Sequence, residues 1–119
     1  MKTLRILVVE DDAMIGTLLG RMLSDLGHDV CAMEASEAGA VAAAAREKPD
    51  LMIVDARLGD GSGVAAVEEI LRSGHIPYVF MSGERVRTDR RDAVVLQKPF
   101  READLIRAMQ RALGAPTTP

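Results

Sequence analysis

The sequence predicts an α/β protein built on a doubly wound, five-stranded parallel sheet. Two observations lead to this prediction. Short runs of aliphatic residues recur along the chain, and the segments between them carry apolar residues with the period of an α-helix. Strands that are separated by helices need crossover connections, and these are right-handed. Helices are therefore expected on both faces of the sheet.

Five apolar runs are expected to be strands. Four are continuous and rich in β-branched residues, which is typical of strands buried on both faces; they are residues 6–9, 51–54, 79–81 and 93–96. A weaker fifth strand is expected over residues 28–33.

Four segments with helical periodicity alternate with these runs; they are residues 15–26, 37–46, 64–71 and 105–113. Ser36 suits the N-cap of the second. Gly27, Gly74 and Gly114 follow the other three, as glycines do where helices end. This order of elements favours a flavodoxin-like sheet, in which ligands bind beyond the carboxyl ends of the strands.

The length and composition predict one domain, residues 1–114, with a flexible proline-containing tail at 115–119. The formal charge of −3 argues against a broad nucleic-acid surface. The single cysteine excludes an internal disulfide, and no apolar run has the length of a leader or a membrane span. We expect a cytoplasmic protein with neither a nucleic-acid nor a membrane partner.

Polar residues follow the predicted strands at the edge where ligands are expected. They are Glu10, Asp11 and Asp12 after the first run, Asp55 after 51–54, Ser82 with Gly83 after 79–81, and Lys98 with Pro99 after 93–96. Because the carboxyl ends of parallel strands share one edge, an acidic cluster should face a hydroxyl and an ammonium group.

This cluster predicts phosphoryl chemistry that depends on a cation. Glu10, Asp11 and Asp55 would repel one another unless a cation lay among them, and a set of oxygen ligands favours Mg²⁺ or Mn²⁺. A carboxylate beside such an ion can attack phosphorus and form an aspartyl phosphate. Ser82 and Lys98 are placed to bind the phosphoryl oxygens.

Each residue also has a simpler interpretation. Asp12 alone suits a helix N-cap, Lys98 a solvated surface group and Ser82 a turn. His28 and His75 suit helix ends or exposed positions. The glycine-rich run 59–63 suits a flexible turn better than a phosphate loop, since no Walker lysine follows. The gathering of four positions at one edge favours a shared function.

The motifs Ile6–Asp12, Leu51–Asp55 and Lys98–Phe100 resemble those of bacterial response regulator receiver domains. The resemblance implies that Asp55 accepts a phosphoryl group from a sensor histidine kinase or a phosphotransferase protein. It also implies that such a domain assists its own phosphoryl transfer and hydrolysis without being an enzyme in the usual sense.

The same resemblance assigns the other site residues. Glu10 and Asp11 would hold Mg²⁺ together with Asp55 and the main-chain carbonyl of Arg57. Ser82 and Lys98 would bind the phosphoryl oxygens, and the Lys98–Pro99 bond would be cis.

Two features depart from the receiver pattern. Residues 83–93 are polar on nearly every side, so the usual fourth helix should be short, absent or mobile. Val95 stands where most receivers carry an aromatic switch residue. The run Phe80–Gly83 resembles the signature of the single-domain FATGUY receivers. Because the aromatic switch residue is missing, we expect phosphorylation to act by ordering segment 83–93.

No effector-like segment follows Leu113 in this sequence, so we expect output through contact with a downstream protein. The resemblance implies that the surface of the first helix around Met14, Ile15 and Leu18 would contact the kinase, unless Met14 belongs to the core. The main alternative is a receiver-fold interaction module that phosphorylation does not regulate. A haloacid-dehalogenase-type phosphatase fits less well, because Arg57 stands where that family has its general acid.

Overall fold

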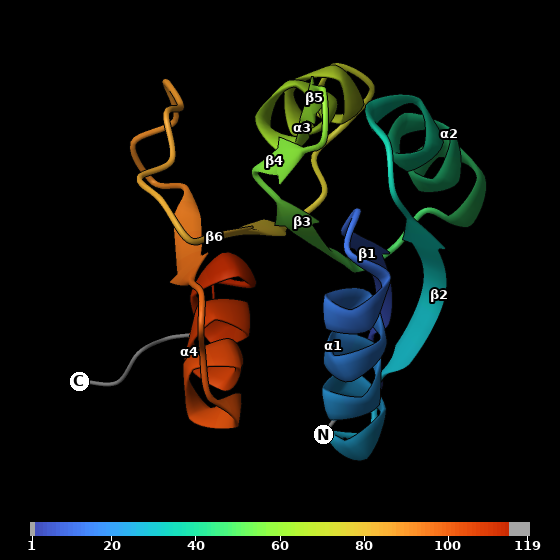
Figure 1. Ribbon diagram of the computed structural model, residues 1–119. Coiled ribbons are helices and arrows are strands. Elements are labelled where there is room, and N and C mark those ends of the chain that lie inside the picture. Colours follow the sequence, from blue (N-terminus) through green and yellow to red (C-terminus); the bar gives the residue numbers. More distant parts are fainter. Residues whose placement is uncertain (1, 115–119) are drawn as a thin grey trace.

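The computed structural model describes residues 2–114 and confirms the predicted architecture (Figure 1). Its main sheet has five parallel strands in the order β2-β1-β3-β6-β7. They are β1 (Arg5–Val9), β2 (Asp29–Glu34), β3 (Leu51–Asp55), β6 (Tyr78–Ser82) and β7 (Val94–Gln97). From β1 the chain moves to β2 at one side of the sheet, and after β2 it crosses back to β3 and continues to β6 and β7 on the other side. The strand order therefore reverses between β1 and β3, and the carboxyl edge has its switch point there.

Two helices pack on each face of the sheet (Figure 1). One layer consists of α1 (Ala13–Asp25) and α4 (Glu102–Ala112), and the other of α2 (Glu37–Glu47) and α3 (Gly63–Leu71). Leu19, Leu23 and Leu105 are buried in the first layer with alternate strand residues. In the second layer α2 contributes small residues, Ala40 and Ala43, which are fully buried and let the helix approach the strands closely.

The helix ends follow the expected capping chemistry. Asp12 is the N-cap of α1 and accepts hydrogen bonds from the N–H groups of Met14 (2.9 Å) and Ile15 (3.2 Å). Ser36 caps α2 in the same way through Gly39 N–H. The N-cap interpretations of Asp12 and Ser36 are therefore confirmed, and each side chain satisfies an N–H that the helix itself cannot pair.

A small hairpin lies between β3 and α3. It pairs β4 (Arg57–Leu58) with β5 (Gly61–Ser62) in antiparallel register. The turn predicted over 59–63 is present at Gly59 and Asp60, whereas Gly61 and Ser62 pair with β4 in a hydrogen-bonded ribbon and Gly63 begins α3. Leu58 in this ribbon is 4% exposed. The ribbon follows Asp55 directly, so it forms one wall of the site at that strand end.

Residues 83–93 contain no helix, as their polar pattern predicts. The segment is attached to α3 by Arg90, whose Nε and Nη2 donate to the two carboxylate oxygens of Glu68 at 2.7 and 3.2 Å. Val86 packs against the core beneath it. The segment therefore has defined contacts although it has no regular structure.

The missing helix has a consequence for β7. Val94 and Leu96 are buried, but Val95 is 42% exposed. The prediction that residues 93–96 are buried on both faces was wrong, because β7 is an edge strand and no helix from 83–93 covers its second face. Among residues 2–114, no helix has the length and apolar character needed to cross a membrane.

Candidate functional site

Polar side chains from four strand ends meet at the carboxyl edge of the sheet. Glu10 and Asp11 follow β1, Asp55 ends β3, Ser82 ends β6 and Lys98 follows β7. Carboxylate oxygens of Glu10, Asp11 and Asp55 all lie within 4.8 Å of one another. The structure thus brings together the residues for which the sequence predicted a joint role.

Lys98 connects two of these carboxylates. Its Nζ lies 2.7 Å from Asp55 Oδ2 and 2.9 Å from Glu10 Oε1. The other Glu10 oxygen accepts the N–H of Asp12 at 3.1 Å. Glu10 and Asp55 are buried, whereas Asp11 is exposed. The simpler interpretation of Lys98 as a solvated surface group was therefore wrong.

The surroundings shift the pKa values of two site residues. Burial raises the pKa of Glu10 above its usual 4.5 and nearby Asp55 raises it further, while the hydrogen bond from Lys98 opposes the shift. Burial lowers the pKa of Lys98, but its hydrogen bonds to Asp55 and Glu10 outweigh burial. The Lys98 pKa therefore lies above the usual 10.5, and the ammonium stays charged at neutral pH.

This arrangement fits a hard divalent cation. Three carboxylates and one ammonium group leave two formal negative charges in the cluster when all four are ionised. Every side-chain donor of the set is an oxygen atom, which is the chemistry that Mg²⁺ prefers. Glu10, Asp11 and Asp55 would therefore hold the ion.

Arg57 contributes its main-chain N–H to the same site. Its N–H donates to Asp55 Oδ1 at 3.1 Å, so the first residue of β4 contacts the carboxylate directly. Its guanidinium extends to Glu84 Oε1 at 3.7 Å, and both side chains are well exposed. An exposed pair at this distance contributes little to stability.

Ser82 is buried at the site, but its hydroxyl is engaged elsewhere. The hydroxyl donates to the carbonyl of Glu84 at 2.7 Å and accepts the N–H of the same residue at 3.0 Å. The expected turn at Ser82 and Gly83 is therefore present. To donate to a phosphoryl oxygen, the hydroxyl would have to leave the Glu84 carbonyl.

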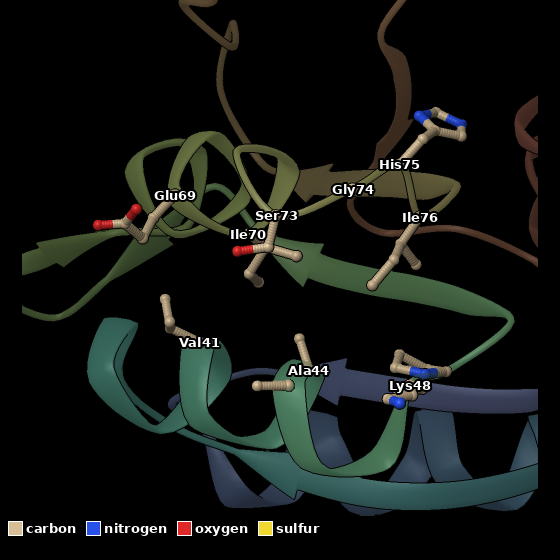
Figure 2. A pocket seen from close by; sticks show the side chains of 11 residues that line it. Val41, Ala44, Lys48, Glu69, Ile70, Ser73, Gly74, His75 and Ile76 are labelled. Carbon is tan, nitrogen blue, oxygen red and sulfur yellow. The ribbon is translucent and has the colours of Figure 1, made fainter.

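The acidic cluster lines a shallow hollow of about 370 Å³. A larger hollow, of about 570 Å³, lies between the carboxyl ends of α2 and α3. Figure 2 shows Val41 and Ala44 of α2 on one side of it, Ile70 of α3 on the facing side, and the side chains of Lys48 and His75 at its rim. The larger hollow is thus at the amino edge of the sheet, away from the clustered carboxylates.

Other residues singled out in the sequence lie outside the cluster. Met14 and Leu18 are 74% and 57% exposed on α1, so Met14 is not a core residue. His28 Nδ1 accepts the N–H of Leu4 at 3.1 Å, and His75 is exposed. The Lys98–Pro99 bond is cis. The tail expected at 115–119 lies outside the described residues.

Sequence reasoning missed one contact beside the site. Glu37, at the start of α2, accepts the N–H of Ser62 in the hairpin at 2.5 Å. The pattern of the sequence carries no signal for this contact except the position of Glu37 in the first turn of a helix, where an acidic residue is common.

Comparison with known proteins agrees with this fold. The response regulator receiver domain family matches residues 6–110. The chain is 33% identical over 114 residues to the phyllosphere-induced regulator PhyR of Methylorubrum extorquens, covering 91% of this chain and 43% of that protein. It is 34% identical over 116 residues to the transcriptional regulatory protein PdtaR of Mycobacterium tuberculosis, covering 92% and 57%.

A solved structure gives the same result. The receiver domain of PhyR from Erythrobacter litoralis superposes with a TM-score of 0.85 at 33% identity, covering 100% of this chain and 96% of that one. The chain spans about half the length of the curated relatives described above. The protein belongs to the response regulator receiver domain family.

Proposed function

We propose that Asp55 accepts a phosphoryl group from a phosphohistidine on a sensor histidine kinase or phosphotransferase protein. The reaction needs Mg²⁺ and changes the contacts that the domain makes with a downstream protein. The observation that carries the proposal is the placement of Lys98 Nζ at 2.7 Å from Asp55 Oδ2 within a cluster of three carboxylates. We also propose that the protein is located in the cytoplasm.

In the transfer, a carboxylate oxygen of Asp55 forms a bond to phosphorus while the bond from phosphorus to the histidine nitrogen breaks. The electron pair of that bond stays on the imidazole, which takes up a proton. Glu10, Asp11 and Asp55 would hold Mg²⁺, which would supply positive charge to offset the carboxylates and the phosphoryl oxygens. Lys98 offers a second positive charge to these oxygens, and Ser82 offers a hydrogen-bond donor once it leaves Glu84.

The same groups support hydrolysis of the product. Water attacks phosphorus, the bond to the Asp55 oxygen breaks, and inorganic phosphate leaves. The chain assists both steps on its own Asp55, so it acts as a signalling phosphoacceptor. The exposed Met14 and Leu18 on α1 form an apolar surface beside the site to which the donor protein would bind.

Incubation with acetyl phosphate tests the proposal, followed by intact-mass measurement. The wild type should gain one phosphoryl group only with Mg²⁺, and Asp55→Asn should gain none. Asp60→Asn, which removes an exposed carboxylate from the neighbouring hairpin, should react like the wild type. A wild type that gains no phosphoryl group from acetyl phosphate or from candidate kinases would favour the interaction module instead.

A further inference from the structure

Glu37 ties the start of α2 to the hairpin that follows β3. Its Oε1 accepts the N–H of Ser62, which is 25 residues away in the sequence, at 2.5 Å. We propose that Glu37 is a positioning residue for the divalent cation at the acidic cluster, acting through this hairpin. The inference rests on the proposed function, because it concerns the affinity of that same cation site.

The register of the hairpin shows how the effect is transmitted. Arg57 of β4 lies opposite Ser62 of β5, and Gly63 N–H donates to the Ala56 carbonyl next to this pair at 2.9 Å. A bond in that position makes the pair of Arg57 and Ser62 a non-hydrogen-bonded one. The main-chain polar groups of these two residues therefore point away from each other, toward the two outer sides of the ribbon.

One outer side faces the acidic cluster. Arg57 N–H donates to Asp55 Oδ1 at 3.1 Å, and the carbonyl of a strand residue points to the same side as its N–H. The Arg57 carbonyl is thus directed to the side of Asp55, outside the ladder. The N–H of Ser62 lies on the opposite outer side, where it donates to the carboxylate of Glu37.

Glu37 gives the hairpin a polar contact with α2 in addition to its other anchors. Leu58 fixes the ribbon to the core, and the Ser62 hydroxyl caps α3 by accepting Ala65 N–H at 3.1 Å. The main-chain N–H of Ser62 donates the hydrogen bond that joins the ribbon to Glu37 of α2. The Glu37 carboxylate also lies at the positive amino ends of both helices, which stabilises its charge there.

Three substitutions of Glu37 and one control distinguish the effect of its side-chain length from the effect of its charge. Glu37→Gln keeps the oxygen acceptor and its reach but removes the charge, whereas Glu37→Asp keeps the charge and shortens the side chain. Glu37→Ala removes both. Glu102→Ala is the matched control, because Glu102 is the first residue of α4 as Glu37 is of α2. Mg²⁺ affinity is measured by titration of amide chemical shifts.

We expect Glu37→Gln and the control to bind Mg²⁺ within about two-fold of the wild type. Glu37→Asp and Glu37→Ala should bind about ten-fold more weakly, the effect typical of an outer partner that orients a metal ligand. Wild-type affinity in Glu37→Asp, or an equal loss in the Glu102 control, would overturn the proposal. A wild type with no Mg²⁺-dependent shifts would overturn the proposed function itself.

A measurement on the wild type alone guards against variants that fold poorly. If the cation and Glu37 act on the same ribbon, saturating Mg²⁺ should slow hydrogen exchange of the Ser62 amide several-fold. The Gly39 amide, which is held by Ser36 at the start of the same helix, should be unaffected. An unchanged exchange rate at Ser62 with the cation bound would also overturn the proposal.

Discussion

A Cβ atom on Gly63 would lie 1.8 Å from the main-chain oxygen of Asp55. The first residue of α3 therefore packs directly on the backbone of the proposed phosphoacceptor. Only a hydrogen atom fits in that space, and the obstructing atom belongs to the backbone of a buried strand, which cannot easily move. The close packing of the start of α3 on the Asp55 backbone thus requires glycine at position 63.

Gly63→Ala should accordingly destabilise the protein strongly. We expect the free energy of unfolding to fall by about 3 kcal/mol, at the upper end of overpacking effects. Urea unfolding followed by circular dichroism measures this change. Gly83→Ala is the control, since nothing lies within 4 Å of its added Cβ, and it should change stability by less than about 0.5 kcal/mol. Equal stability of the two variants would contradict the contact.

Lys98 offsets the charge of two buried carboxylates, so its removal should destabilise the protein without metal. In Lys98→Met we expect the free energy of unfolding to fall by about 2 kcal/mol, because Glu10 and Asp55 lose their shared partner. Mg²⁺ should then stabilise Lys98→Met more than the wild type, since the ion supplies the missing positive charge. Unfolding experiments with and without Mg²⁺ measure both effects.

Lys2→Met, which removes an exposed ammonium group, serves as the control and should behave like the wild type under both conditions. If Mg²⁺ stabilised Lys98→Met no more than the wild type, the charge-balance explanation of the cluster would be wrong.

The sheet and helices follow from the sequence because burial imposes a period on each element. The site was predictable for a related reason. Parallel strands end at a common edge, so Glu10, Asp55 and Lys98 had to meet there once the strands were assigned. Neither step needed any knowledge of how an individual side chain points.

The contacts that periodicity does not encode were the ones missed. Glu37 meets Ser62 across 25 residues and Arg90 meets Glu68 across 22, and both depend on where loops lie on the helices. The exposure of Val95 is a different case from these two contacts, because it could have been predicted from the sequence. A polar segment 83–93 leaves β7 without a covering helix, and this conflicts with a strand buried on both faces.

The pair of Arg90 and Glu68 predicts a pH dependence of the segment 83–93. The hydrogen bond from Arg90 lowers the pKa of Glu68 below its usual 4.5 in the folded protein. The folded state then binds this proton less readily than the unfolded state. The contribution of the pair to stability is complete above pH 4.5 and is lost as the pH falls through the lowered pKa.

The Arg90 Nε–H resonance reports this transition directly. We expect its chemical shift to change below pH 4.5 in the wild type, with the amides of residues 88–92 following it. In Glu68→Gln the change should disappear, because the partner no longer titrates. Persistence of the same transition in Glu68→Gln would show that another group controls the segment.

Ser82 provides the last prediction, which concerns the start of that segment. Its hydroxyl accepts the N–H of Glu84 and donates to the carbonyl of the same residue, so one side chain closes the turn twice. Ser82→Ala should speed hydrogen exchange of the Glu84 amide about five-fold, as expected for a hydrogen bond worth about 1 kcal/mol. Ser73→Ala, which alters an exposed serine beyond α3, should leave that rate unchanged. If Glu84 exchanged equally fast in the wild type and Ser82→Ala, the hydroxyl would already be available to a phosphoryl group without leaving the turn.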